Sequence, residues 1–178
     1  MHMTNNSNGK FAGCALSVVE SPDRDGVAAG TQEDWRNVPI IESYSNCSAG
    51  YHPVLIRDGW QIAQLNYERT LRLSAIRRMD RHLATDEVFV LVKGAPVLIG
   101  AEETPTGLRF EALRIMPGLT YNIPIGQWHN IAMRPGDVVI VVEKSLTHER
   151  DFEYRDLNTP ELRDLRVAVS KARKGGGR

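Results

Sequence analysis

Cysteine is scarce in this sequence: only Cys14 and Cys47 occur among its 178 residues. Their separation is not that of a metal-binding pair. A disulfide between them would form only if the fold brought the two side chains together, which their spacing does not show. We therefore expect both residues to be free thiols.

The sequence also lacks long apolar runs and an excess of charge of either sign. No run reaches the roughly 18 apolar residues that a membrane-spanning helix needs. The first residues are polar, whereas a secretory signal would be basic and then apolar. Lysine plus arginine (22) equal aspartate plus glutamate (22), and no basic stripe is interleaved with aromatic residues. We therefore expect a cytoplasmic protein that binds neither a membrane nor nucleic acid.

The length suits one domain with a single core. Residues 1–32 are rich in Asn, Ser, Gly and Asp, a composition that predicts a mobile N-terminal arm. Residues 33–158 form the predicted β-domain, and its first part, 35–57, is expected to lie over a sheet as an extended covering segment. Residues 159–178 form a predicted C-terminal helix and tail.

Short segments of β-type sequence, bounded by Gly and Pro turns, dominate the middle of the chain. They occupy residues 60–67, 70–79, 87–92, 97–100, 108–116, 129–133 and 137–142. This rhythm predicts an all-β fold, a sandwich or barrel, rather than alternating strands and helices. Only the C-terminal segment has helical spacing, with Thr159 as the expected N-cap and Pro160 at the first helical position.

Side chains of the type that bind metals stand just before the predicted strand 87–92. Asp80 and His82 lie two residues apart, so they point to one face of a strand, and Glu87 joins them after a short bend. His129 comes from another hairpin. Two histidines and one carboxylate form the set that holds Fe(II) with open positions, and Zn, Mn, Ni or Co are also compatible with it. Asp80 is either a fourth ligand or the partner of a neighbouring arginine.

At these positions the sequence resembles the cupin family. The first cupin motif is matched by His82, Glu87 and Gly94, and the second by Gly118, Pro124, Gly126 and His129. Asp80 stands where the family has its first histidine, and Met133 where it has a closing asparagine. The resemblance covers about residues 60–145. It implies a single antiparallel jelly-roll β-barrel that binds a divalent metal (Fe, Mn, Ni or Zn) through His82, Glu87, His129 and Asp80, or a barrel of this type that has lost its metal.

The resemblance implies a protein that acts on a small oxygen-rich metabolite, either a hydroxy or keto acid or a sugar derivative. The run 121–129 is similar to the same stretch of ureidoglycolate lyases, which favours lyase-type or isomerase-type chemistry. An Fe(II) dioxygenase and a binding protein without turnover are the alternatives. Glu87 and Tyr121 are the candidates for proton transfer. Glu143 is expected at the barrel rim, paired with a basic neighbour, with a general base inside the barrel as the alternative.

The strand 87–92 is apolar on both faces after its glutamate. If Glu87 points into the barrel, Phe89 and Leu91 point inward as well, and Val88 and Val90 face outward. An apolar outer face needs a cover, which the covering segment or a second subunit would supply. We therefore predict a homodimer.

Overall fold

The computed structural model describes residues 40–175. The predicted arm, 1–32, lies outside the described residues. A compact unit begins at Ser48, and residues 40–47 belong to a separate unit. Cys47 is disulfide-bonded, so the prediction of a free thiol is wrong for this residue, and Cys14 lies outside the described residues. None of the described helices has the length and apolar composition needed to cross a membrane.

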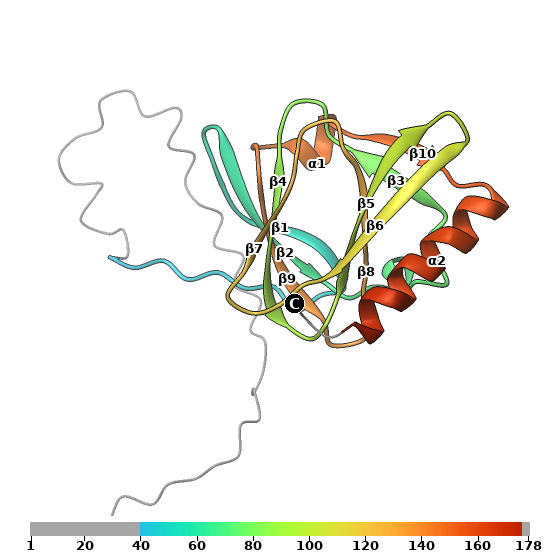
Figure 1. Cartoon of the computed structure of the whole chain (residues 1–178). Coiled ribbons are helices and arrows are strands. Elements are labelled where there is room, and N and C mark those ends of the chain that lie inside the picture. The colour runs from blue at the N-terminus through green and yellow to red at the C-terminus, as the bar shows by residue number, and fades with distance from the viewer. Residues whose placement is uncertain (1–39, 176–178) are drawn as a thin grey trace, which may run out of the picture. The chain divides into compact units, whose positions relative to one another are not determined.

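The compact unit is built from two antiparallel sheets of five strands each in the described part of the chain (Figure 1). The first sheet contains, in spatial order, β1 (Gly50–Arg57), β2 (Trp60–Asn66), β9 (Val138–Glu143), β4 (Glu87–Lys93) and β7 (Thr120–Ile123). The second contains β10 (Glu153–Asp156), β3 (Arg78–Arg81), β8 (Trp128–Ala132), β5 (Val97–Thr104) and β6 (Gly107–Arg114). The all-β jelly-roll prediction is confirmed, although the two sheets stay separate instead of closing into one barrel.

The helices are short except for the last one. A 3₁₀ turn, η3 (Arg69–Leu71), follows β2, and α1 (Thr147–Arg150) follows β9. The C-terminal helix α2 (Thr159–Lys174) is confirmed, but its N-cap is Asn158 rather than the expected Thr159. Asn158 and Glu161 form a reciprocal capping box, with 3.0 Å between each backbone nitrogen and the partner's side-chain oxygen.

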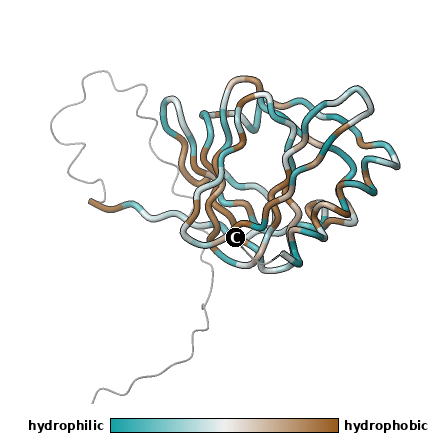
Figure 2. The backbone as a smooth tube through the Cα atoms, in the orientation of Figure 1, coloured by the Kyte–Doolittle hydropathy of each residue, from teal (hydrophilic) through white to brown (hydrophobic). Residues whose placement is uncertain are grey.

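The second sheet is buried on both faces, which explains its apolar strands. Val97 and Ile99 of β5 pack against Leu165 and Val169 of α2, whereas Leu98 belongs to the core between the two sheets. Figure 2 shows hydrophobic residues recurring along the strands of both sheets. Because α2 covers the outer face of the second sheet, the inner faces are left to build a core and a cavity between the sheets.

The segment 70–79, predicted as a strand, is a connection for most of its length. The 3₁₀ turn begins it, the nitrogen atoms of Ala75 and Ile76 both donate to the Arg72 carbonyl, and β3 starts only at Arg78. Its alternation of apolar residues has another cause: Leu71 packs against the core between the sheets and Ile76 belongs to the core beneath α2. The spacing of these apolar residues reflects two separate cores, and it resembles the two-residue period of a strand.

Part of the segment expected to lie over the sheet is itself a strand, because β1 pairs antiparallel with β2 at the sheet edge. The inward alternation of β4 is as predicted, with Glu87 and Phe89 buried. On its outer face Val88 and Val90 are partly buried and Val92 is exposed. The homodimer predicted from this face stays a prediction.

Candidate metal centre

The candidate metal ligands meet at one end of the space between the two sheets, although His129 is far in sequence from the other three. Asp80 of β3 is directly opposite His129 of β8 in the second sheet. Glu87 begins β4 in the first sheet, and His82 follows β3. All four side chains line a cavity of about 770 Å³.

Glu87 lies at the centre of this cluster. Its Oε2 atom is 2.6 Å from His129 Nε2 and 3.6 Å from His82 Nε2. His129 Nε2 is 3.8 Å from Asp80 Oδ2, and the two imidazole centroids are 5.3 Å apart. One ligand atom each from Asp80, His82 and His129 forms a group within 4.8 Å, and His82, Glu87 and Glu143 form a second such group.

Both histidines are oriented through their other ring nitrogen. His129 Nδ1 is 3.0 Å from the Gln127 carbonyl, and His82 Nδ1 contacts the Asp151 carbonyl. A carbonyl oxygen only accepts hydrogen bonds, so each Nδ1 carries a proton, and in the neutral ring Nε2 directs a lone pair into the cluster. Metal-binding histidines are held in this way by backbone carbonyls.

The central carboxylate has an unsatisfied oxygen. Glu87 is 8% exposed, and apart from its 2.6 Å ion-pair contact with His129 Nε2, its Oε2 has no hydrogen-bond partner among the described residues. Such a buried oxygen is costly unless a cation lies beside it. Two imidazole nitrogens and this carboxylate are the ligand types that Fe, Mn, Ni and Zn accept, so the residues fit a divalent metal.

Without a metal, Glu87 and His129 stabilise each other as an ion pair. Burial by itself would raise the pKa of Glu87, but the two neighbouring imidazoles outweigh it and lower that pKa to about 2. Burial would also lower the pKa of His129, and Glu87 outweighs it, raising that pKa to about 9. The proton on His129 therefore takes the place of the cation in the metal-free protein.

A second polar group lies beside the ligands, and two of its members, Tyr51 and Glu143, line the cavity. Tyr51 of β1 donates its hydroxyl hydrogen to Glu143 Oε1, and Gln61 Nε2 donates to the same oxygen at 2.8 Å and to the Tyr51 hydroxyl at 2.9 Å. Gln61 is fully buried, and its Oε1 accepts from the Leu146 nitrogen at 2.8 Å. Burial raises the pKa of both Tyr51 and Glu143.

Glu143 is therefore inside the fold, and the expectation that it lies at the rim is wrong. It is 6% exposed and directly opposite Gln61 across β9 and β2. The sequence showed Glu143 only as a strand end. It held no signal for Gln61 of β2 or for Tyr51, whose strand β1 was expected to lie over the sheet. Hydrogen bonds between three separate strands place this group.

No model of a known protein family matches this chain, and no curated protein matches its sequence. A cupin-2 domain protein from Shewanella frigidimarina is a similar solved structure, with 18% identity over 56% of this chain and 84% of that one, at a TM-score of 0.40. KdgF from Halomonas has 17% identity over 58% and 86%, at 0.39. An oxalate oxidase bound to glycolate has 13% identity over 84% and 87%, at 0.47. Similarities of this size say nothing about activity.

The arrangement of this chain itself matches what the two motifs predicted. Two five-stranded antiparallel sheets face each other, and the motif residues His82, Glu87 and His129 meet between them. This arrangement is the antiparallel jelly roll that the resemblance to cupins implied. Gly94 follows β4 with a φ of +93°, and Asp137, which begins the approach to β9, occupies the space where a side chain at Gly94 would stand.

Tyr121 is not brought to the cluster. Its ring packs against the core between the sheets, but its hydroxyl accepts from the Met116 nitrogen at 3.1 Å and lies 3.4 Å from the Arg114 carbonyl. It lines a separate hollow of about 370 Å³ next to β5 and β6. The predicted role of Tyr121 in proton transfer thus has no support from its position.

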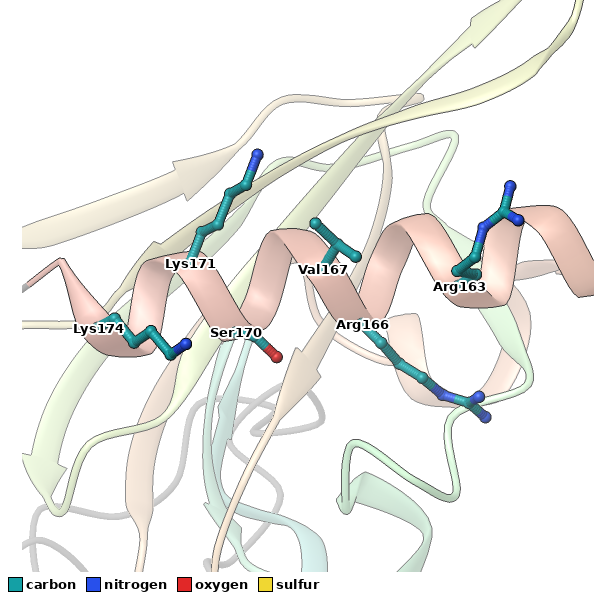
Figure 3. Close-up of a pocket in the computed structure, with 6 residues that line it drawn as sticks. All are labelled: Arg163, Arg166, Val167, Ser170, Lys171 and Lys174. Atoms are coloured by element: carbon teal, nitrogen blue, oxygen red, sulfur yellow. The ribbon is translucent and has the colours of Figure 1, made fainter.

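Another hollow, of about 390 Å³, lies along the outer face of α2 (Figure 3). Its lining is Arg163, Arg166, Val167, Ser170, Lys171 and Lys174. In Figure 3 the basic side chains extend to different sides of the helix and do not converge on a common point. These residues are the solvent-exposed face of an amphipathic helix, with its basic residues near the C-terminus.

Proposed function

We propose that this protein is a metal-dependent cupin that binds a small oxygen-rich metabolite between its sheets and acts on it by lyase-type or isomerase-type chemistry. The unsatisfied Oε2 of Glu87 carries the proposal, because it lies buried between two imidazole nitrogens that are already oriented by backbone carbonyls. A divalent cation satisfies all three groups at once.

His82, Glu87 and His129 would hold the ion, and Asp80 would be a fourth ligand at the more exposed side of the site. Three or four protein ligands leave coordination positions for a metabolite. When bound, such an ion polarises a carbonyl or hydroxyl oxygen and lowers the cost of removing a neighbouring proton. Fe, Mn, Ni and Zn are all compatible with this mixed nitrogen and oxygen set.

Proton transfer falls to Glu143 rather than to Tyr121. Glu143 lines the same cavity as the ligands, and one of its oxygens lies within 4.8 Å of ligand atoms of His82 and Glu87. Tyr51 and Gln61 both donate to its Oε1 and so fix the carboxylate beside the ligands. Glu87 acts as a ligand in this proposal and not as the base.

The cavity size agrees with a small ligand. About 770 Å³ lies within the range of pockets that enclose small molecules, and Phe89 and Ile131 supply apolar walls beside the polar cluster. Such walls keep water away from a reacting group. The homodimer and the cytoplasmic location expected from the sequence remain part of the proposal.

Metal content tests the proposed function. Purified protein, stripped with a chelator and reloaded with Fe²⁺, Mn²⁺, Ni²⁺ or Zn²⁺ in turn, is expected to retain at least one of these metals. His129→Ala should lose it, and Asp80→Ala should lose less. His52→Ala is the matched control, because His52 contacts the Ala49 carbonyl and does not line the cavity.

Two outcomes contradict the proposal in different ways. Equal metal content in wild type, His129→Ala and Asp80→Ala would mean that the metal binds elsewhere. Wild-type protein that takes up none of the four metals would assign the cavity to metal-free ligand binding.

A further inference from the structure

Charge is distributed unevenly around the cavity. Five carboxylates line it: Glu68, Asp80, Glu87, Glu143 and Asp156. The basic groups that line it are two guanidinium groups, Arg77 and Arg78, and three histidines, His82, His129 and His148. Among the described residues that line the cavity, carboxylates therefore outnumber the permanently charged arginines.

Neither guanidinium group contacts the carboxylates at the buried end of the cavity. Arg77 Nη1 donates to the carbonyls of Ser74 and Ile76, at 2.8 Å each. The Cζ atom of Arg78 lies 3.7 Å from the centre of the Tyr154 ring. Both arginines are exposed. At the buried end, three carboxylates lie near the histidines, and no lysine or arginine of the described lining accompanies them.

This distribution disfavours an acidic ligand. With a divalent ion bound and both ligand imidazoles neutral, Asp80, Glu87 and Glu143 leave a surplus of negative charge. A ligand carboxylate would add to that surplus, and like charges close together in a buried site repel strongly. Proteins that select carboxylates use a bidentate arginine, and neither arginine of the lining is directed to the buried end. An uncharged ligand meets none of these costs, and its hydroxyl hydrogens find acceptors in the carboxylates.

The mouth of the cavity carries a different kind of surface. Phe152 and Tyr154 line it and are 42% and 51% exposed, with their ring centroids 5.3 Å apart. Exposed aromatic side chains at a cavity indicate a contact surface for a ligand. A ligand that fills this cavity contacts hydrogen-bond-accepting carboxylates at one end and aromatic rings at the other. It therefore needs hydroxyl groups for the first and a flat apolar face for the second.

We propose that the ligand of this cavity is an uncharged sugar in its ring form, and not a hydroxy or keto acid. Its hydroxyl groups bind at the ion and at Glu143, and the carbon face of its ring packs on Phe152 and Tyr154. The inference rests on the proposed function, because the charge balance includes the bound ion.

Matched pairs of ligands test the charge argument. Wild-type protein loaded with Mn²⁺ is titrated calorimetrically with common aldohexoses and with the uronic acid of the same skeleton, glucose against glucuronate and galactose against galacturonate. The neutral member of a pair should bind about tenfold or more tightly than its acid. Acids that bind as tightly as the sugars, or the absence of binding by every neutral sugar, would overturn the proposal.

Two variants test the separate parts of the site. Glu143→Gln removes one negative charge and should reduce the preference for the neutral member, whereas Glu149→Gln, which lies outside the cavity lining, should leave it unchanged. Phe152→Ala should weaken sugar binding by about threefold or more. Trp60→Ala is the control, because Trp60 is also 42% exposed and does not line the cavity. An unchanged preference in Glu143→Gln, or equal affinities in Phe152→Ala and Trp60→Ala, would count against the sugar site.

The two proposals fail separately. Metal content is measured on the same samples, so a protein that keeps its metal but prefers acids refutes the sugar ligand and leaves the metal centre standing. Loss of metal in the wild type refutes the proposed function itself.

Discussion

Removing His129 should destabilise the metal-free protein by an amount that depends on pH. In the metal-free protein Glu87 is buried, and the contact between its Oε2 and His129 Nε2 is the shortest in the cluster, at 2.6 Å. His129→Ala removes that partner and leaves a buried carboxyl group. Breaking a buried pair in this way costs more than the pair contributes, because the remaining charge is uncompensated.

The magnitude follows from the pKa of Glu87. Its fall from an ordinary value of 4.5 to about 2 corresponds to about 3 kcal/mol of stability. The contribution of Glu87 is complete above pH 4.5 and is lost as the pH falls toward 2. That of His129 is complete below its ordinary pKa of 6.5 and is lost as the pH rises through about 9. The same interaction underlies both shifts, so it stabilises the fold fully between pH 4.5 and pH 6.5.

Urea unfolding in the presence of a chelator measures the effect. At about pH 5.5, His129→Ala should lose about 3 kcal/mol in the free energy of unfolding, and His52→Ala should lose little. The variant should also become less stable as the pH rises from 4.5, because its buried Glu87 must then ionise with only the more distant His82 beside it. A loss below about 1 kcal/mol, or a variant with the wild-type pH profile, would refute the ion pair.

Three further predictions concern the fold, the metal and the assembly. Gly94→Ala places a Cβ atom 2.0 Å from Asp137 Oδ1 at a backbone φ of +93°. Gly118→Ala is the control, because Gly118 has a φ of +80° and no atom lies within 4 Å of the added Cβ. The melting temperature of Gly94→Ala should fall well below that of Gly118→Ala, and equal melting temperatures would contradict this. His129 holds its proton up to about pH 9 in the metal-free protein, and a metal must displace that proton. Metal affinity should therefore rise by up to about tenfold per pH unit below about pH 9. A metal affinity that does not change between about pH 7 and about pH 9 would be inconsistent with His129 as a ligand. Sedimentation at micromolar concentration should give a dimer, and a monomer would leave the outer face of the first sheet without a subunit to cover it.

Local pattern predicted most of the fold. The strands β2, β4, β6, β8 and β9 were expected close to their observed bounds, because Gly and Pro turns delimit them and their burial follows the period of the strand. The segment 70–79 was predicted wrongly because its apolar residues serve two separate cores. The short elements α1 and β10 were not predicted, since they hold little apolar periodicity and form by pairing and packing with distant parts of the chain.

The candidate ligands were predicted from the same kind of local information. Asp80, His82 and Glu87 lie within eight residues at a strand mouth. The structure brings Asp80 opposite His129 by pairing β3 with β8, and Glu87 reaches them from β4 of the other sheet. Their roles as ligands remain predictions until the metal content is measured. Tyr121 was chosen for its closeness in sequence to the second motif, and the structure directs its hydroxyl to the backbone of β6 instead.

The sequence by itself determined which residues alternate, where the chain turns and which side chains are able to bind a metal, because these depend on neighbours a few positions away. Only the tertiary structure decided which groups meet beside the ligands. Tyr51, Gln61 and Glu143 come from β1, β2 and β9, and their hydrogen bonds exist only after those strands pair in register. Burial, which shifts the pKa of Glu143, is likewise a property of the assembled sheets, so a residue expected at the rim became part of the site.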